Sequence, residues 1–258
     1  MLLLLPLKHH STAKLRLGGV LSLAERGALV QAMASDLLQT LTCQRSIARI
    51  VVVSEDPRAA ELAAQWKVEF LDESALDGAR GLNDVVNSAA RHLAARATND
   101  LACIAGDLPL LTAEELSEFI RTHAATRGFS GSLQPSVTLA PDRWREGTNL
   151  IAWQPDSAFS VAFGPASMER HRQQAAAIGA RFSLCESAGG GHDIDEPRDL
   201  HALAFDTPRS LAPHTRRYLN ESGIFARLAD ARPAGRGREQ DAMADAPIPI
   251  PILSEARR

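Results

Sequence analysis

Short apolar runs alternate with helical segments along the first half of the chain, and this alternation restricts the fold more than any other feature. Leu2–Leu5, Ile50–Ser54 and Val68–Leu71 have the length and composition of buried strands. A capping box predicts a helix from Ser22 to about Thr42, and an Asp-Pro start predicts another from Asp56 to Trp66. Strands separated by helices form parallel, doubly wound sheets, so we expect an α/β fold.

Length, charge and cysteine content limit the number of domains and the kinds of partner that this chain can have. The 258 residues suffice for one large domain, which we expect over residues 1–228; residues 229–258, rich in Arg, Gly, Ala, Asp and Pro, read as a disordered tail. The formal net charge of −3 gives no basic footprint for nucleic acid, and no apolar run reaches the length of a membrane helix. The opening MLLLLPLKHH has no basic residue before its apolar part, which favours a strand over a signal peptide. Three scattered cysteines fit a cytoplasmic protein.

The stretch Leu101–Leu111, LACIAGDLPLL, combines a strand with a carboxylate. Proline cannot donate to a sheet ladder, so Pro109 ends the strand and leaves Asp107 at its carboxyl end. In open α/β sheets ligands bind at that edge. Asp107 therefore either caps a turn or holds a divalent metal over a phosphate.

The polar loop after the first strand carries three cations, Lys8, Lys14 and Arg16. Cations and small residues in such a position suit a polyphosphate, although a solvated basic loop has the same composition. The loop contains neither GxGxxG nor GxxxxGK[ST], so neither a dinucleotide-binding fold nor a Walker ATPase is supported.

A second acidic signal is His192-Asp-Ile-Asp195. In a strand, alternate residues face the same way, so Asp193 and Asp195 point together and repel each other unless a cation lies between them. With Asp107 they supply the hard oxygens that magnesium prefers, whereas His192 does not suit that ion.

Three further stretches each allow a structural and a functional interpretation. Asn83 either caps the helix expected from about Asp84 to Ala97 or reads a base edge. Gly147-Thr148-Asn149 lies in a two-stranded excursion that bounds a cleft, where it is either an anion cradle or a hairpin turn. Ser167, at the start of a helix that Pro165 opens, is a helix cap or part of an anion site. One amphipathic helix is expected over Leu211–Leu228.

Taken in order, these motifs resemble the 2-phospho-L-lactate guanylyltransferases, which serve biosynthesis of the deazaflavin coenzyme F-420. The resemblance spans about residues 2–205. The matching residues are Pro6-x-Lys8, Ala13-Lys14-x-Arg16-Leu17, Glu25-Arg26, Gly81-Leu82-Asn83, Gly106-Asp107-Leu108-Pro109-Leu110-Leu111, Ala140-Pro141-Asp142-Arg143, Gly147-Thr148-Asn149, Phe163-Gly164-x-x-Ser167 and Asp193-Ile194-Asp195.

This resemblance implies a Rossmann-like nucleotidyltransferase fold of the glycosyltransferase-A type, with a mostly parallel sheet. It implies transfer of GMP from GTP to the phosphate of a small phosphorylated acid (2-phospho-L-lactate, phosphoenolpyruvate or 3-phospho-D-glycerate) with release of pyrophosphate. The product would pass to a downstream transferase, and a homodimer is compatible with the family. Mg²⁺ would be the cofactor, and no protein nucleophile is needed because the acceptor phosphate is already ionised.

The site residues follow by the same resemblance. Lys14 and Asp107 would be catalytic, and Asp107, Asp193 and Asp195 would bind the metal. GTP would contact Lys8, Lys14, Arg16 and Asn83, and the acceptor would contact Lys14, Thr148, Gly164 and Ser167.

One departure and two alternatives remain. Arg145-Glu146 replaces the Gly-Thr that many members carry before Gly147-Thr148, which puts the choice of acceptor in doubt. A related nucleotidyltransferase for a sugar phosphate or a molybdopterin would carry a GxGxR-type loop after the first strand, and Lys8–Gly19 has none. A nucleotide-binding module without turnover is the alternative outside the enzymes.

Overall fold

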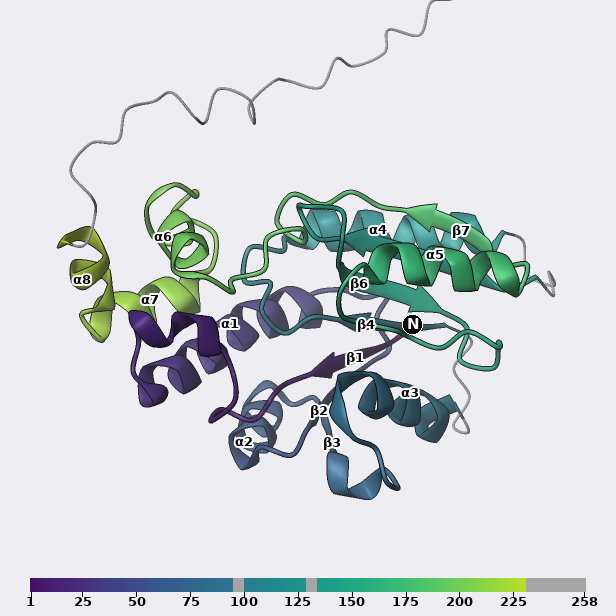
Figure 1. The fold of residues 1–258 in the computed structure, drawn as a ribbon, viewed down its shortest axis with the longest axis horizontal. Helices are drawn as coiled ribbons and strands as arrows, with labels where there is room; N and C mark the ends of the chain where they lie inside the picture. The colour runs from purple at the N-terminus through teal and green to yellow at the C-terminus, as the bar shows by residue number, and fades with distance from the viewer. Residues whose placement is uncertain (95–99, 129–133, 231–258) are drawn as a thin grey trace, which may run out of the picture.

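The computed structural model describes residues 1–94, 100–128 and 134–230. Its centre is a seven-stranded sheet in the order β3-β2-β1-β4-β6-β5-β7 (Figure 1). The strands are β1 (Leu2–Pro6), β2 (Arg49–Ser54), β3 (Glu69–Asp72), β4 (Leu101–Ile104), β5 (Ser136–Pro141), β6 (Thr148–Trp153) and β7 (Arg181–Leu184). β6 is antiparallel to both of its neighbours, and all other pairs are parallel. The expected mostly parallel α/β sheet is confirmed.

Helices cover both faces of this sheet. They are α1 (Leu23–Thr42), α2 (Pro57–Trp66), α3 (Gly81–Ala94), α4 (Ala113–Arg127), α5 (Ser167–Ala177), α6 (Pro197–Phe205), α7 (Pro213–Glu221) and α8 (Ile224–Asp230), with the 3-10 turns η1 (Leu15–Gly19) and η2 (Glu73–Ala75). Side chains of α1, α2 and α4 pack on one face, and those of α3 and α5 pack on the other. The capping box at Ser22 and Glu25 and the Asp56 cap, both expected from the sequence, are present.

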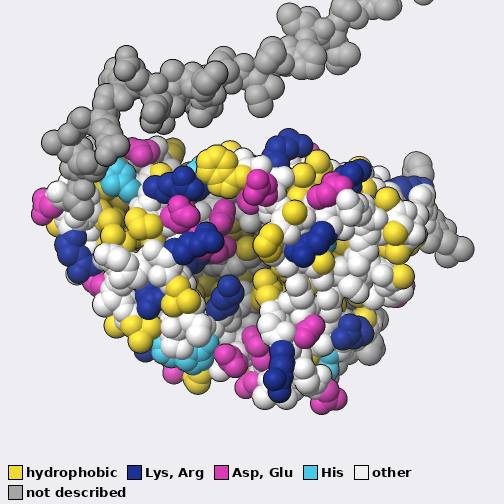
Figure 2. Space-filling model, in the orientation of Figure 1, with side chains coloured by type: hydrophobic (Ala, Val, Ile, Leu, Met, Phe, Trp, Pro, Cys, Tyr) yellow, Lys and Arg dark blue, Asp and Glu magenta, His cyan; other side chains and the backbone are white. Residues whose placement is uncertain are grey.

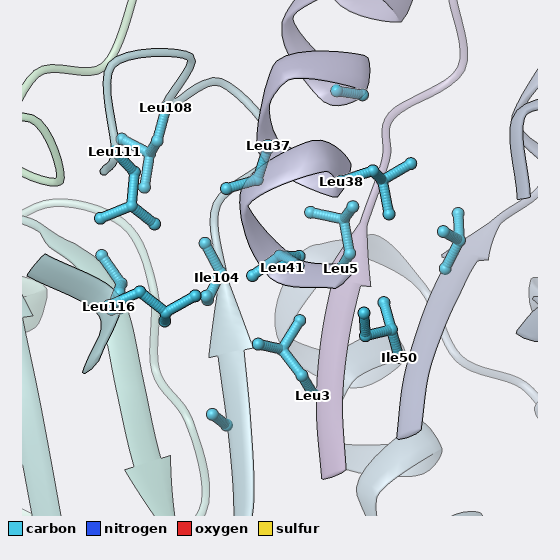
Figure 3. Close-up of a cluster of buried hydrophobic side chains, with 14 of the residues drawn as sticks. Leu3, Leu5, Leu37, Leu38, Leu41, Ile50, Ile104, Leu108, Leu111 and Leu116 are labelled. Carbon is cyan, nitrogen blue, oxygen red and sulfur yellow. The ribbon is translucent and has the colours of Figure 1, made fainter. Parts of the chain in front are cut away.

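The four leucines of β1 explain why this strand lies in the middle. Leu3 and Leu5 belong to the cluster beneath α1, α2 and α4, whereas Leu2 and Leu4 belong to the cluster beneath α3. Figure 3 shows Leu5 beside Leu38 and Leu41 of α1, within the first cluster. A strand buried on both faces reads as a continuous apolar run rather than an alternating one.

The helices after β7 form a separate layer on the outer side of α1. Met33 of α1 packs with Leu200 of α6 and Leu219 of α7 in a third cluster. The buried carboxylate of Asp36 in α1 accepts the Thr215 backbone N–H and hydroxyl at 2.9 and 2.6 Å, which fixes the start of α7. The single helix expected over Leu211–Leu228 is wrong, because Gly223, with φ of 73°, separates α7 from α8.

The two strands expected as an excursion are β5 and β6, and they lie inside the central sheet rather than outside it. β6 pairs with β4, with Leu150 opposite Ile104, and so joins both strands to the central sheet. The tail expected from residue 229 lies, beyond Asp230, outside the described residues. Within the described ranges, no helix combines the length and the hydropathy that crossing a membrane requires.

Candidate active site

The topology places a crevice at the carboxyl ends of β1 and β4. From β1 the chain continues to β2 and β3 on one side, whereas β4 lies on the other side of β1. Ligands bind where the strand order reverses in this way. A cavity of about 540 Å³ opens there, lined by residues that follow four strands: Lys8 after β1, Glu55 after β2, Glu73 after β3, and Asp107 after β4. Acidic and basic side chains gather around a hollow on the face shown in Figure 2.

Lys14 joins the two acidic segments of the site. Its Nζ lies 2.5 Å from Oδ2 of Asp107 and 2.6 Å from Oδ1 of Asp195, and its side chain is 7% exposed. Burial alone would lower the pKa of Lys14, but the charges of Asp107 and Asp195 outweigh it, so this pKa is raised. Lys14 itself has φ of 51°, a left-handed conformation that turns its side chain inward just before η1.

The segment carrying Asp193 and Asp195 is an irregular connection, not the strand expected from its sequence. Its position beside Asp107 is nevertheless fixed, because the backbone N–H of Ile194 donates to the Asp107 carbonyl at 3.2 Å. Burial, followed by the charge of Asp107, raises the pKa of Asp193. Gly189 permits this close packing, since a Cβ there would lie 2.1 Å from the carbonyl oxygen of Leu110.

The carboxylates fit a divalent cation by their chemistry. Oδ1 of Asp107 is buried and has no hydrogen-bond partner within the described residues. Because buried polar atoms are normally paired, this oxygen is available to bind a cation. The Lys14 ammonium lies between Asp107 and Asp195. In the described part of the chain, the residues that bring ligand atoms within 4.8 Å of one another are His9, His10 and Asp56, and not the three aspartates. Asp56 Oδ2 is already bonded to the N–H and Nδ1 of His10.

The three expected cations separate in the structure. Lys8 and Lys14 line the cavity. Arg16 does not, because its side chain is 71% exposed and directed toward Glu196, at 3.6 Å. Its expected contact with GTP therefore has no support in this geometry.

Asn83 neither caps a helix nor faces the cavity. α3 begins at Gly81, so Asn83 lies in its first turn. Its Nδ2 donates to the Phe163 carbonyl at 3.1 Å and its Oδ1 accepts the Phe163 N–H at 2.6 Å, which uses its amide in a link to the segment before α5. The neighbours Gly81 and Leu82 line the cavity and Asn83 does not, so the base contact expected of Asn83 stays a prediction.

The loop between β5 and β6 is organised around a carboxylate of its own. Asp142 accepts the backbone N–H groups of Trp144 and Glu146 at 3.1 and 3.0 Å, and that of Gly147 at 2.9 Å. The anion cradle expected over Gly147–Asn149 thus has its Gly147 N–H occupied by Asp142. Asn149 serves the site indirectly, since its Nδ2 holds the Gly190 carbonyl at 3.0 Å.

Thr148 and Ser167 lie together as a buried pair, and the exposed Gly164 adjoins them through its carbonyl, which accepts the Ser167 N–H at 3.0 Å. Thr148 Oγ1 lies 3.2 Å from Ser167 Oγ and 2.9 Å from Nδ1 of His171. The N–H groups of Ser167 and Met168 are bonded to the Gly164 and Glu146 carbonyls, so the start of α5 is not a free anion site. Gly164 has φ of 116°, which only glycine adopts readily.

Sequence reasoning missed four polar residues of this region. Glu73 and Arg80 line the cavity beyond β3, and neither side chain has a hydrogen-bonded or ion-paired partner in the described chain. His171 and Asn87 have no distinguishing pattern in the sequence, since each is a single polar residue within a helix. Glu73 follows the third strand, so the strand-end rule that identified Asp107 would have found it.

Comparisons with known proteins identify the family to which the chain belongs. A family model described as "Guanylyl transferase CofC like" matches residues 1–236. Phosphoenolpyruvate guanylyltransferase of Sphaerobacter thermophilus is 33% identical, covering 79% of this chain and 92% of its own. 3-Phospho-D-glycerate guanylyltransferase of Phenylobacterium zucineum is 33% identical over 74% of this chain and 84% of its own. 2-Phospho-L-lactate guanylyltransferase of Methanothrix thermoacetophila is 32% identical over 76% and 80%.

Solved structures share the fold at low sequence identity. A protein described as a candidate nucleotide-diphospho-sugar transferase from Desulfovibrio desulfuricans superposes with a TM-score of 0.65, 15% identity, and coverage of 88% of this chain and 97% of its own. The 4-diphosphocytidyl-2C-methyl-D-erythritol synthase of Anaerococcus prevotii gives a TM-score of 0.51 at 10% identity, covering 85% and 98%. The Rossmann-like nucleotidyltransferase architecture is therefore confirmed.

Proposed function

Because this chain belongs to the CofC-like guanylyl transferase family, we propose that it transfers GMP from GTP to the phosphate of a small phosphorylated carboxylic acid. The relatives act on phosphoenolpyruvate, 2-phospho-L-lactate or 3-phospho-D-glycerate, as their names state. The enzyme class, a nucleotidyltransferase, follows from the family, and a role in coenzyme F-420 biosynthesis fits it. The acceptor acid, the residue roles and the cofactor are the proposed part.

The observation that carries this proposal is the Lys14–Asp107–Asp195 cluster at the inner end of the cavity. A triphosphate needs cations and a metal-binding carboxylate at one end of its site. Lys8, Lys14 and Asp107 meet that need beside the ends of β1 and β4. The sugar and base would then extend along the ends of β2 and β3, where the cavity continues.

The outer end of the cavity has groups that complement guanine. The N1–H and 2-amino group of guanine are donors, which a carboxylate accepts, and its O6 and N7 are acceptors, which an arginine fork binds. Glu73 and Arg80 line this end and have no competing partner in the described chain. Burial, followed by the charges of Glu55 and Asp72, raises the pKa of Glu73. A hydrogen-bond donor from the base would therefore stabilise the charged carboxylate there.

Mg²⁺ is the cofactor that the donor set suits best, and Asp107, Asp193 and Asp195 would hold it. Bound there, it would supply charge stabilisation for the transferring phosphoryl group. The orphaned Oδ1 of Asp107 and the raised pKa of Asp193, caused by burial and then by the charge of Asp107, both support a cation at this position.

In the proposed reaction, an oxygen of the acceptor phosphate forms a bond to the α-phosphorus of GTP. The bond from that phosphorus to the bridging oxygen breaks, and pyrophosphate leaves with the electron pair. Two unit charges about 4 Å apart repel by about 4 kcal/mol at an effective dielectric near 20, so cations are the main requirement. Lys8 and Lys14 would offset this repulsion and orient the two phosphates, which leaves no role for a protein nucleophile.

The acceptor is proposed to lie on the β6 side of Asp107, against Lys14, Thr148, Gly164 and Ser167. Thr148 begins β6 next to the end of β4, since the Ala105 N–H donates to the Asn149 carbonyl at 2.9 Å. Arg145 is paired with Glu186, which supports an acceptor site that does not use the Arg145 guanidinium. We further propose a cytoplasmic location, transfer of the product to a downstream transferase, and a homodimer as the assembly.

A product assay tests the function. The purified chain is incubated with GTP, Mg²⁺ and each of the three acids, and pyrophosphate release and the mass of the diphosphate product are measured. Asp107→Asn and Asp193→Asn should each lower the rate at least ~100-fold, the effect of losing a stabiliser of transition-state charge. Asp156→Asn, an exposed carboxylate after the far end of β6, is the matched control.

Turnover with a sugar 1-phosphate or a molybdopterin in place of the three acids would replace this function with the related one. GTP binding without product from any acceptor would instead favour a module without turnover.

A further inference from the structure

A buried group of three hydrogen-bonding side chains lies where β6 and α5 begin. Thr148, Ser167 and His171 are respectively 7%, 1% and 0% exposed. Thr148 Oγ1 is the common partner, 2.9 Å from His171 Nδ1 and 3.2 Å from Ser167 Oγ. His171 was not anticipated from the sequence, and the proposed reaction above gives it no role.

The hydrogen bond at the second ring nitrogen of His171 determines which nitrogen carries the proton. Nε2 accepts the backbone N–H of Ala162 at 2.7 Å, so it must present a lone pair. A neutral imidazole has one N–H, which must then be on Nδ1 and donate to Thr148. Burial, with a contribution from Arg170, lowers the pKa of His171 to about 4, so the ring is neutral at pH 7.

This tautomer fixes the direction of the Thr148 hydroxyl. A hydroxyl oxygen has two lone pairs and one O–H. His171 and Ser167 donate to the two lone pairs, and no acceptor for the Thr148 O–H exists in the described residues. The Thr148 hydroxyl is therefore left as a donor, which is the role that an anionic oxygen requires.

The segment that fixes His171 is itself held from the other side. Asn87 exchanges two hydrogen bonds with Val161, at 2.8 and 3.0 Å, and Asn83 does the same with Phe163. Ala162 lies between these two residues, so its N–H cannot rotate away from the ring. Helix α3, whose first residues line the nucleotide cavity, thus sets the position of His171.

We propose that His171 is a positioning residue that, through its Nδ1–H, turns the Thr148 hydroxyl into a donor for an anionic oxygen of the phosphorylated acid. The inference rests on the proposed function only in identifying that anion as the acceptor substrate. It assigns to the chain a specificity element for acceptor oxygens at the start of β6 and in α5.

Two variants of the full chain separate this role from packing. The amide nitrogen of Asn occupies the place of Nδ1, so His171→Asn keeps a donor to Thr148. The amide of Gln reaches the place of Nε2, so His171→Gln keeps the contact with Ala162 and loses that donor. One lost hydrogen bond of about 1 kcal/mol corresponds to about a fivefold to tenfold loss of affinity.

We expect His171→Gln to raise KM for the acid about tenfold, with KM for GTP unchanged, and His171→Asn to recover most of the loss. Thr148→Val should match His171→Gln, and the double variant should be no worse than either single one, since both remove the same donor. Equal losses in the Asn and Gln variants, a parallel rise in KM for GTP, or an unchanged KM in His171→Gln would each overturn the proposal.

Calorimetric binding of phosphoenolpyruvate without GTP provides a readout that is independent of turnover. If the wild-type chain binds it and His171→Gln binds about tenfold more weakly, the inference stands even when no product forms and the proposed function fails. If the wild-type chain turns over but the variants bind equally, the function stands and the inference fails. Absence of binding by the wild-type chain, at concentrations that saturate turnover, would also overturn the inference.

Discussion

Lys14 Nζ lies 2.5 Å from Asp107 Oδ2, although the two residues are 93 positions apart in the chain. The same ammonium bonds Asp195 from a third segment, so one cation joins the loop after β1, the end of β4 and the connection before α6. Removing it would leave carboxylates facing one another without compensation. The stability of this edge of the sheet and its affinity for cations are therefore linked.

Lys14→Met tests that link. Breaking a buried ion pair costs 3–5 kcal/mol, and because Asp195 remains partly exposed we expect roughly 2 kcal/mol here. Mn²⁺ or Mg²⁺ should recover more of the melting temperature in the variant than in the wild-type chain, since the carboxylates are then free to bind it. Thermal unfolding with and without the ion measures this. Equal metal-induced shifts in both proteins would show that Lys14 and the ion do not share these ligands.

Glu73→Gln tests the placement of guanine. A carboxylate that accepts the N1–H and 2-amino group makes the enzyme prefer GTP over ITP, which lacks that amino group. We expect the variant to lose about tenfold in kcat/KM for GTP and most of the GTP/ITP preference, the size of one good base contact. Glu61→Gln, on the exposed surface of α2, is the control. A variant that retained the full GTP/ITP ratio would place the base elsewhere.

Asn83→Ala distinguishes the two roles that its motif suggests. Because its amide holds the Phe163 backbone, its loss should raise KM for the acid and lower the melting temperature, with little change in KM for GTP. A selective rise in KM for GTP would restore the base contact inferred from the resemblance. Steady-state kinetics with each substrate varied in turn provides the measurement.

The pKa of His171 predicts a dependence of stability on pH. Its value of about 4, against 6.5 for a free imidazole, means that only the unfolded chain binds this proton between those two values. The contribution of His171 is complete above pH 6.5 and is lost as the pH falls toward 4, by about 3 kcal/mol in total. Urea unfolding at pH 7.5 and 4.5 should show a smaller acid loss in His171→Asn. The same loss in both proteins would contradict this account.

Local signals predicted much of the fold. The Asp56-Pro57 pair predicted the start of α2, and the capping box at Ser22 predicted the start of α1, because these signals depend on neighbours within one turn. α3 begins three residues before its expected start, and Asn83 is drawn into a contact with Phe163, 80 residues away. A contact of that range leaves no trace in local periodicity.

The candidate site divides in the same way. Asp107 and Asp195 were expected together because both would supply oxygens to one metal ion, and in the structure both contact the Lys14 ammonium. The occupation of Gly147 N–H by Asp142 and of Thr148 by His171 could not be foreseen, since each depends on side-chain geometry between elements. Arg16 shows the converse, a cation close in sequence to Lys14 that points away from the cavity.

The reversed direction of β6 has one more consequence. Since β6 runs against β4 and β5, the edge that carries the cavity receives its beginning, Thr148, directly after a hairpin loop. Thr148 is anchored by its pairing in the sheet and by its hydrogen bonds to Ser167 and His171 of α5. Under the proposed function, substitutions in this short loop would change the surroundings of the acceptor without altering the ends of β2 and β3, where the nucleotide is proposed to extend.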